Sequence, residues 1–165
     1  MRVILMLCLI AVAILLEQTV LNFLRVAGVK PDLLLLLVVF NGFLKGPREG
    51  AFWGFIAGIL EDLAFGYYIG LHALSKLAAG YVAGLGEYVY KENSIVAAAM
   101  VWGTSLVSGC VMYVLLLTLG IALAPGEVFL RVVLPAAVYN GLVSLLFYQP
   151  YRNSTIRGIL REERF

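Results

Sequence analysis

The sequence predicts an all-α integral membrane protein, a bundle of six transmembrane helices. Hydrophobic residues make up 62% of the 165 residues and charged residues only 13%, about half the charged share of a soluble domain. The apolar residues also come in long runs divided by short polar links, and a helix that crosses a bilayer needs roughly 20 such residues. A soluble domain of this length could not cover so much apolar surface with polar side chains.

Six apolar runs are long enough, or nearly so, to cross a bilayer. The first starts at Val3 and lacks a small-residue cleavage pattern, so we expect an uncleaved helix. Pro31 opens the second run, where its missing N–H costs nothing. This run is short, so we expect either a helix that crosses the bilayer with little tilt or a segment that is partly re-entrant. Pro135 should bend the sixth. The spans are expected at about 3–24, 31–44, 49–65, 71–90, 94–123 and 127–148.

The links are too short to divide the chain, so we expect one transmembrane domain over residues 1–150 and a cytoplasmic tail over 151–165. Lys and Arg in the links set the orientation, because they are retained in the cytoplasm. With six spans both termini lie on one side, and eight of these residues fall there against at most three on the other. We therefore expect both termini to be cytoplasmic.

The third predicted span carries small residues at every fourth position, with Asp62 in the fourth place. On a helix this spacing makes one stripe along which a second helix can approach closely. Packing within the bundle and contact with another protein both fit the pattern. The glycines are Gly50, Gly54, Gly58, Gly66 and Gly70.

Several ionisable residues gather near the predicted outer ends of the spans, where such groups are paired, reach water or act in function. Asp62 follows Glu61 in the third span, and His72 and Lys76 are four apart on one face of the fourth. A short link makes these helices antiparallel neighbours, so Asp62 or Glu61 should meet Lys76. Glu17 lies deeper in the first span and is expected to face the bundle interior.

This predicted polar cluster has three interpretations. It is a structural ion pair that fixes the hairpin, a polar patch that lines an outward-facing cavity, or part of a proton relay. The residues lie near one end and do not cross the membrane, which argues against the relay. Glu17 is likewise either a hydrogen-bonded structural carboxylate or a cavity residue shared with the third and fourth helices.

Catalytic and metal-binding patterns are missing from the sequence. It has no Gly-x-Ser-x-Gly, no His-Glu-x-x-His and no phosphate-binding loop. Adjacent Glu61 and Asp62 point about 100° apart on a helix, a poor geometry for paired carboxylates. Cys8 and Cys110 lie in apolar runs, and His72 is the one histidine, too few ligands for a metal site. A net charge of +2 gives no nucleic-acid footprint. We expect no enzyme activity, no cofactor and no nucleic-acid partner.

Three motifs follow one another between Pro31 and Gly84. Pro31-Asp32-Leu33-Leu34-Leu35 opens the second helix, Gly54-x-x-x-Gly58-x-x-x-Asp62 ends the third, and Gly66-x-x-x-Gly70-Leu71-x-Ala73-Leu74 leads into the fourth. In this order they resemble the rod shape-determining protein MreD family. Chain length and the number of predicted spans extend the resemblance over the whole chain.

The resemblance implies a non-catalytic membrane subunit of the bacterial cell-elongation complex, located in the inner membrane. Such proteins associate with MreC, a single-span protein with a periplasmic domain. They help to regulate peptidoglycan synthesis by RodA and its penicillin-binding partner, alongside the actin-like MreB.

The resemblance also implies a fold similar to that of the substrate-binding S components of energy-coupling-factor vitamin transporters. The alternative function is therefore an S-component-like subunit that binds a small molecule, such as a vitamin. Those components often dock through an Ala-x-x-x-Ala stripe. Here Ala11 is followed at that spacing by Leu15, which argues against the alternative.

Overall fold

The computed structural model describes residues 2–19, 28–65, 68–86, 88–89, 91–121 and 123–156. Every long element in these ranges is a helix, which confirms the all-α prediction. The last three elements follow one another without a break, so the described residues form six helical rods. The elements are α1 (Arg2–Thr19), α2 (Leu33–Lys45), α3 (Pro47–Phe65), α4 (Leu71–Leu85), α5 (Ser94–Thr118), α6 (Pro125–Val128), the π-helical segment η1 (Phe129–Val133) and α7 (Leu134–Ile156).

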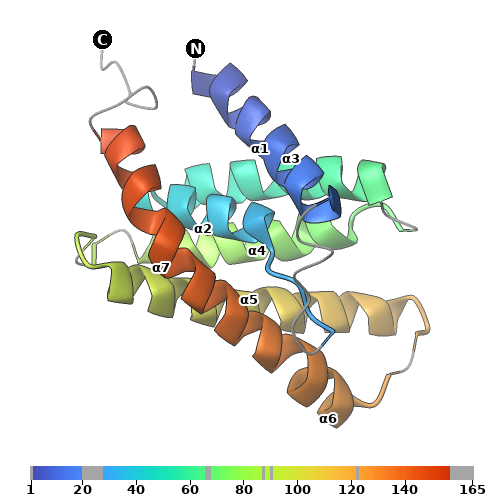
Figure 1. Ribbon diagram of the computed structural model, residues 1–165. Coiled ribbons are helices and arrows are strands. Elements are labelled where there is room, and N and C mark those ends of the chain that lie inside the picture. The colour runs from blue at the N-terminus through green and yellow to red at the C-terminus, as the bar shows by residue number, and fades with distance from the viewer. Residues whose placement is uncertain are drawn as a thin grey trace.

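Helix α2 is the centre of the bundle. It contacts α1, α3, α4, α5 and α7, and most of its side chains, including every one from Val38 to Phe43, are buried. Helices α3, α4 and α5 lie beside it, whereas α1 and the long α7 cross this group obliquely (Figure 1). The apolar run that the sequence shows at 31–44 is therefore a core helix surrounded by other helices.

The turns that follow α2 and α4 meet the C-terminal part of α7 at one end of the bundle, called here the basic end and marked by Lys91 and Arg152. The Lys91 ammonium donates a hydrogen bond to the carbonyl of Leu44 at 3.0 Å. The Tyr148 hydroxyl donates to the carbonyl of Lys91 at 2.7 Å, and Arg152 pairs with Glu92 at 3.3 Å. The start of α1 and the end of α7 lie on the same side of the molecule (Figure 1).

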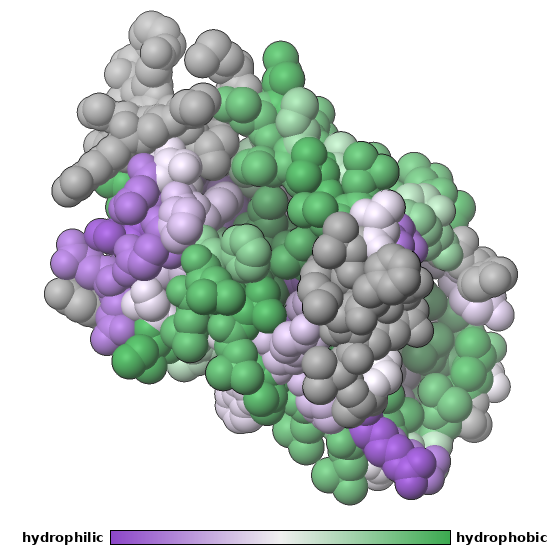
Figure 2. All heavy atoms as spheres, in the orientation of Figure 1, coloured by the Kyte–Doolittle hydropathy of each residue, from purple (hydrophilic) through white to green (hydrophobic). Residues whose placement is uncertain are grey.

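The exterior of the bundle is largely apolar. Figure 2 shows hydrophobic side chains over most of one face, with polar atoms gathered near the C-terminal part of α7 and again around α6. Helix α7 presents an exposed apolar stripe, because its large side chains recur every three or four residues. Exposed fractions there are 50% for Val138, 60% for Leu142, 40% for Leu145 and 75% for Leu146.

Two of the described helices are long and apolar enough to cross a membrane, namely Ser94–Thr118 and Pro125–Ile156. The segments Val3–Thr19 and Leu33–Lys45 are apolar but shorter. Helix α2 has 13 residues, so it rises about 20 Å, less than the ~30 Å thickness of a hydrocarbon core. Its burial among other helices is the physical reason why it can be this short.

The sixth predicted helix contains a wide turn that the sequence did not specify. Residues Phe129–Val133 form a π-helical segment, and Pro135 lies two residues after its end. A proline cannot donate to the preceding turn and its ring crowds the carbonyl four residues earlier. The wider turn relieves both problems, so the irregularity expected at Pro135 lies just before it.

Some helix ends differ from those predicted. Helix α4 ends at Leu85 instead of residue 90, and α5 ends at Thr118 instead of residue 123. The chain after α5 turns through Gly120, whose φ of 78° favours glycine. Helix α7 continues to Ile156, so the first residues of the predicted tail are helical. The end of the first span beyond Thr19, and residues 157–165, lie outside the described residues.

Candidate functional site

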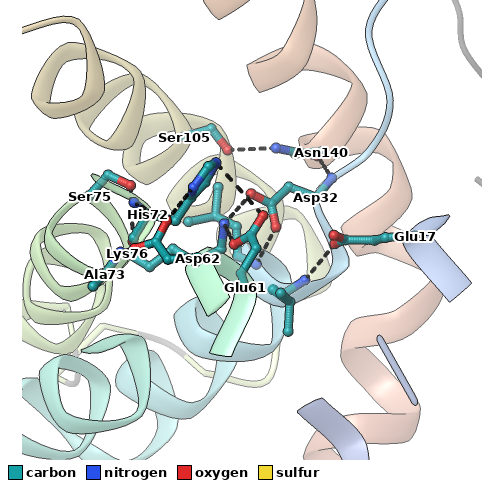
Figure 3. Close-up of polar contacts among 12 residues, drawn as sticks. Glu17, Asp32, Glu61, Asp62, His72, Ala73, Ser75, Lys76, Ser105 and Asn140 are labelled. Atoms are coloured by element: carbon teal, nitrogen blue, oxygen red, sulfur yellow. Dashed lines mark hydrogen bonds and ion pairs between the residues drawn. The ribbon is translucent and has the colours of Figure 1, made fainter. Parts of the chain in front are cut away.

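Charged and polar side chains from α1, α2, α3, α4 and α7 meet at the end of the bundle opposite the basic end. Figure 3 shows how they point toward one another around the first turns of α2 and α4. This polar cluster is defined here as Glu17, Asp32, Glu61, Asp62, His72, Lys76 and Asn140.

Asp62 caps a helix to which it does not belong. Helix α4 begins after Gly70, which has φ 106° and no side chain to cap the first turn. The Asp62 carboxylate accepts hydrogen bonds from the backbone N–H groups of Gly70 at 2.8 Å, His72 at 3.2 Å and Ala73 at 3.2 Å. The first N–H groups of a helix have no partner within it, and a carboxylate there also favours the helix dipole. Asp62 therefore joins the end of α3 to the start of α4.

Lys76 is the buried cation of the cluster. Its side chain is 1% exposed, and its ammonium lies 2.7 Å from Asp32 Oδ2 and 2.7 Å from Glu61 Oε2. Helices α2, α3 and α4 each contribute one member to this ion-pair triad. A buried ammonium is tolerated only when its charge is paired, so the triad fixes the relative position of three helices.

Two carboxylates cap the start of α2. Asp32 is its N-cap residue, and one oxygen accepts the Leu35 N–H at 2.7 Å. Glu17 of α1 accepts the Leu34 N–H at 3.0 Å. The two side chains thereby satisfy N–H groups that the helix leaves without a partner.

Asn140 ties α7 to the same point. Its side-chain oxygen accepts the Asp32 N–H at 2.8 Å, and its amide donates to the Ser105 hydroxyl of α5 at 3.2 Å. His72 sits at the edge of the cluster with 37% of its side chain exposed. Its Nδ1 lies 2.8 Å from Asp62 Oδ1, and its Nε2 lies 3.9 Å from Glu61 Oε1. The cluster thus joins α1, α2, α3, α4, α5 and α7.

A cavity of about 250 Å³ lies beside the polar cluster. Its lining combines Glu17, Lys30 and Lys76 with hydroxyl and amide groups and with apolar residues of η1. A second, apolar cavity of about 300 Å³ lies between α1, α2 and α7, where Val12, Phe40 and Phe147 are among its walls. Among the described residues, no group of three or more His, Cys, Asp or Glu side chains could hold a metal ion.

The structure brings together all five residues of the predicted polar cluster: Glu17, Glu61, Asp62, His72 and Lys76. Of the two acids considered for Lys76, Glu61 pairs with it and Asp62 caps α4 instead. The sequence reasoning missed Asp32 and Asn140 as members. One signal for Asp32 was its place directly before an apolar run, which is typical of an N-cap. A polar Asn140 inside the sixth apolar run predicts an interhelical hydrogen bond, which the structure confirms, but the sequence does not identify its partners.

The glycines of the predicted stripe have different surroundings. A Cβ added to Gly50, Gly54 or Gly58 would collide with the backbone of α4, at Gly80, Lys76 and Ala73 respectively. These three glycines therefore let α3 and α4 pack at close range. Gly66 lies outside the described residues.

The expectation that Gly70 belongs to this stripe is wrong. Helix α3 ends at Phe65, so Gly70 lies in the turn before α4. A Cβ added there would meet nothing within 4 Å. Its positive φ, instead of close packing, is what suits glycine at this position.

Comparison with known protein families gives a match over most of the chain. The family described as rod shape-determining protein MreD matches residues 1–153. Nothing among curated proteins or solved structures matches the chain, so the fold similarity to S components stays a prediction. The family match covers nearly the whole sequence and includes every residue of the polar cluster. The chain therefore belongs to the rod shape-determining protein MreD family.

Proposed function

We propose that this membrane protein is a non-catalytic subunit of the bacterial cell-elongation complex that binds the single-span protein MreC. In this role it would help to regulate peptidoglycan synthesis by RodA and its penicillin-binding partner, together with MreB. Membership of the MreD family carries the proposal, because it gives the chain a role in rod-shape determination.

The arrangement of the polar cluster supports a structural role over a catalytic one. Asp32 and Asp62 cap helices, and Lys76 is enclosed by two carboxylates. Each of these three groups therefore has a partner that holds helices of the bundle together. A catalytic acid or base must instead reach a substrate proton within hydrogen-bond distance. A rigid bundle with an apolar exterior is what a partner helix in the membrane requires.

We propose six membrane crossings with both termini in the cytoplasm and the polar cluster at the outer surface. The packing of α3 on α4 supports alternating crossings. Gly50 lies against Gly80 and Gly58 against Ala73, so the two helices run in opposite directions. The Lys and Arg residues near the basic end are those expected on the cytoplasmic side. The shorter helices would cross the membrane where the bilayer is locally thinned around them.

A partner helix has to use an outward face, because the glycine stripe of α3 is already covered by α4. We propose the apolar cavity between α1, α2 and α7 as that place. Helix α1 makes few contacts with the rest of the bundle, and Val12 on it is 51% exposed. Between membrane helices close packing is the main source of affinity, so an open apolar groove favours a helix.

Co-expression with the cognate MreC tests this proposal. The chain is captured by an affinity tag in mild detergent and analysed by size-exclusion chromatography, with both proteins detected. We expect co-elution of the wild-type chain with MreC, and loss of MreC from Val12→Trp, whose side chain would fill the groove. Val138→Trp is the matched control, because Val138 is 50% exposed on α7 and does not line the groove. Elution of the wild-type chain alone would contradict MreC binding, and equal capture by both variants would contradict the groove.

A further inference from the structure

The polar cavity contains a carboxylate that has no cationic partner among the described residues. Glu17 is 3% exposed and lines the cavity. From the described part of the chain it accepts one hydrogen bond, from the Leu34 N–H at 3.0 Å. The neighbouring acids Asp32 and Glu61 differ from it, because both are paired with Lys76. An uncompensated carboxylate charge is costly at a buried position, so a positive group in the cavity would stabilise the ionised form of Glu17.

The same cavity contains an ammonium group that no described carboxylate pairs with. Lys30 lies in the segment before α2 and lines the cavity while staying partly exposed. It offers a binding position for a negative group. Within the described part of the chain, the cavity therefore has one acid and one base that remain available, alongside a triad whose charges are already paired.

The rest of the cavity suits a small polar molecule. Hydroxyl groups of Ser105 and Ser108 and the amide of Asn140 line it, and Val133 adds an apolar wall. Its volume of about 250 Å³ is slightly below the usual range of ligand pockets, roughly 300–1,000 Å³. Val133 belongs to the π-helical segment, and π-helical turns occur often at functional sites.

We propose that this cavity binds a small zwitterion, whose ammonium group pairs with Glu17 and whose anionic group pairs with Lys30. The proposal goes beyond MreC binding, which does not require an occupied cavity. Such a group occurs in the headgroup of phosphatidylethanolamine and also in free small molecules. Both sources carry the same ammonium and anionic groups, and the two arms of the experiment distinguish between them.

The first arm measures binding of O-phosphoethanolamine to the full chain in detergent by isothermal titration calorimetry. Ethanolamine and inorganic phosphate are the probes that carry one kind of charge each. We expect saturable binding of O-phosphoethanolamine, at least roughly tenfold tighter than either single-charge probe. Glu17→Gln and Lys30→Gln should each weaken it at least about tenfold, the loss of one charged hydrogen bond. The amide oxygen introduced by Glu17→Gln would still accept the Leu34 N–H, so the cap of α2 is kept.

Matched controls are Glu127→Gln and Arg131→Gln, which remove a surface pair with exposed fractions of 68% and 78%. They should bind as the wild-type chain does. Ethanolamine binding as tightly as O-phosphoethanolamine would overturn the proposal in favour of a simple cation site. Unchanged binding in Glu17→Gln or Lys30→Gln would overturn it as well.

The second arm compares the melting temperature of the chain in nanodiscs of phosphatidylethanolamine and of phosphatidylglycerol. Higher stability in phosphatidylethanolamine that disappears in both variants, without binding of the soluble probe, supports the proposal with a lipid as the source. Binding of the soluble probe without a lipid preference supports a free small molecule. Absence of both effects in a chain that is folded by size-exclusion chromatography would overturn the proposal.

Discussion

Lys76 shows most clearly how single residues hold this bundle together. Its ammonium is 1% exposed and touches carboxylates of two other helices. We expect Lys76→Met to lower the free energy of unfolding by up to about 3–5 kcal/mol, because two partly buried acids, whose side chains are 30% and 13% exposed, would lose their shared cation. The melting temperature in detergent, followed by tryptophan fluorescence, measures this loss.

Arg131→Met is the control for Lys76→Met, since the Arg131–Glu127 pair is exposed and surface pairs contribute little. Adding Asp32→Asn and Glu61→Gln to Lys76→Met should restore part of the stability, because the uncompensated charges are then gone. An equal loss in Lys76→Met and Arg131→Met would show that the triad does not stabilise the fold.

The cap that Asp62 provides can be tested by amide exchange in the first turn of α4. Asp62→Ala removes the acceptor for the N–H groups of Gly70, His72 and Ala73. Loss of a helix cap costs about 0.5–2 kcal/mol, and we expect faster amide exchange in the first turn of α4. Hydrogen–deuterium exchange with mass spectrometry over residues 68–76 measures it, and Asp62→Asn, which keeps one acceptor, should lie between. Unchanged exchange in the alanine variant would contradict the cap.

The cluster residues show how far sequence reasoning can reach at this scale. The sequence identifies the candidates for the cluster because ionisable groups inside apolar runs are rare unless they are paired or functional. These are Glu17, Glu61, Asp62, His72 and Lys76. The short link between α3 and α4 also predicts that these helices are neighbours. It does not determine which acid meets Lys76, since that depends on the helix rotation and on the position of α2, which brings Asp32 into the triad.

At the scale of helices, close packing of α3 on α4 depends on glycine. We expect Gly58→Ala to destabilise the chain, because its Cβ would collide with the backbone at His72 and Ala73, and backbone cannot yield as a flexible side chain does. Gly103→Ala is the matched control. Its Cβ would meet nothing within 4 Å, so it should be neutral or gain up to about 1 kcal/mol from helix propensity.

Yield and melting temperature of the two variants test this prediction. Equal behaviour of Gly58→Ala and Gly103→Ala would mean that the two helices can separate without cost. The glycine spacing alone predicted a packing stripe but not its partner, because the same spacing serves contacts within and between chains. The π-helical turn at Phe129–Val133 also could not be placed from the sequence, since Pro135 indicates a bend without specifying how the helix accommodates it.

At the scale of the whole molecule, composition was sufficient to predict an all-helical membrane protein. The short apolar run at 31–44 is close to the observed α2, Leu33–Lys45, but the sequence does not show why so short a helix is stable, which is that other helices surround it. Burial by neighbours depends on the tertiary arrangement, which the hydropathy of one segment does not contain. The proposed six crossings place the polar cluster at the outer surface, and this position in turn makes its cavity accessible from outside. One experiment can therefore test all three parts of this claim together.

Cysteine accessibility in intact spheroplasts tests that claim most directly. Cys8 and Cys110 are exposed and free, so both are first replaced by alanine. Single cysteines are then introduced as Arg48→Cys near the basic end, and as Ile69→Cys and Glu127→Cys at the opposite end. We predict that a membrane-impermeant maleimide labels positions 69 and 127 in intact spheroplasts and position 48 only after lysis. Labelling of position 48 from outside, or protection of positions 69 and 127 until lysis, would contradict the proposed orientation and the outward-facing cavity.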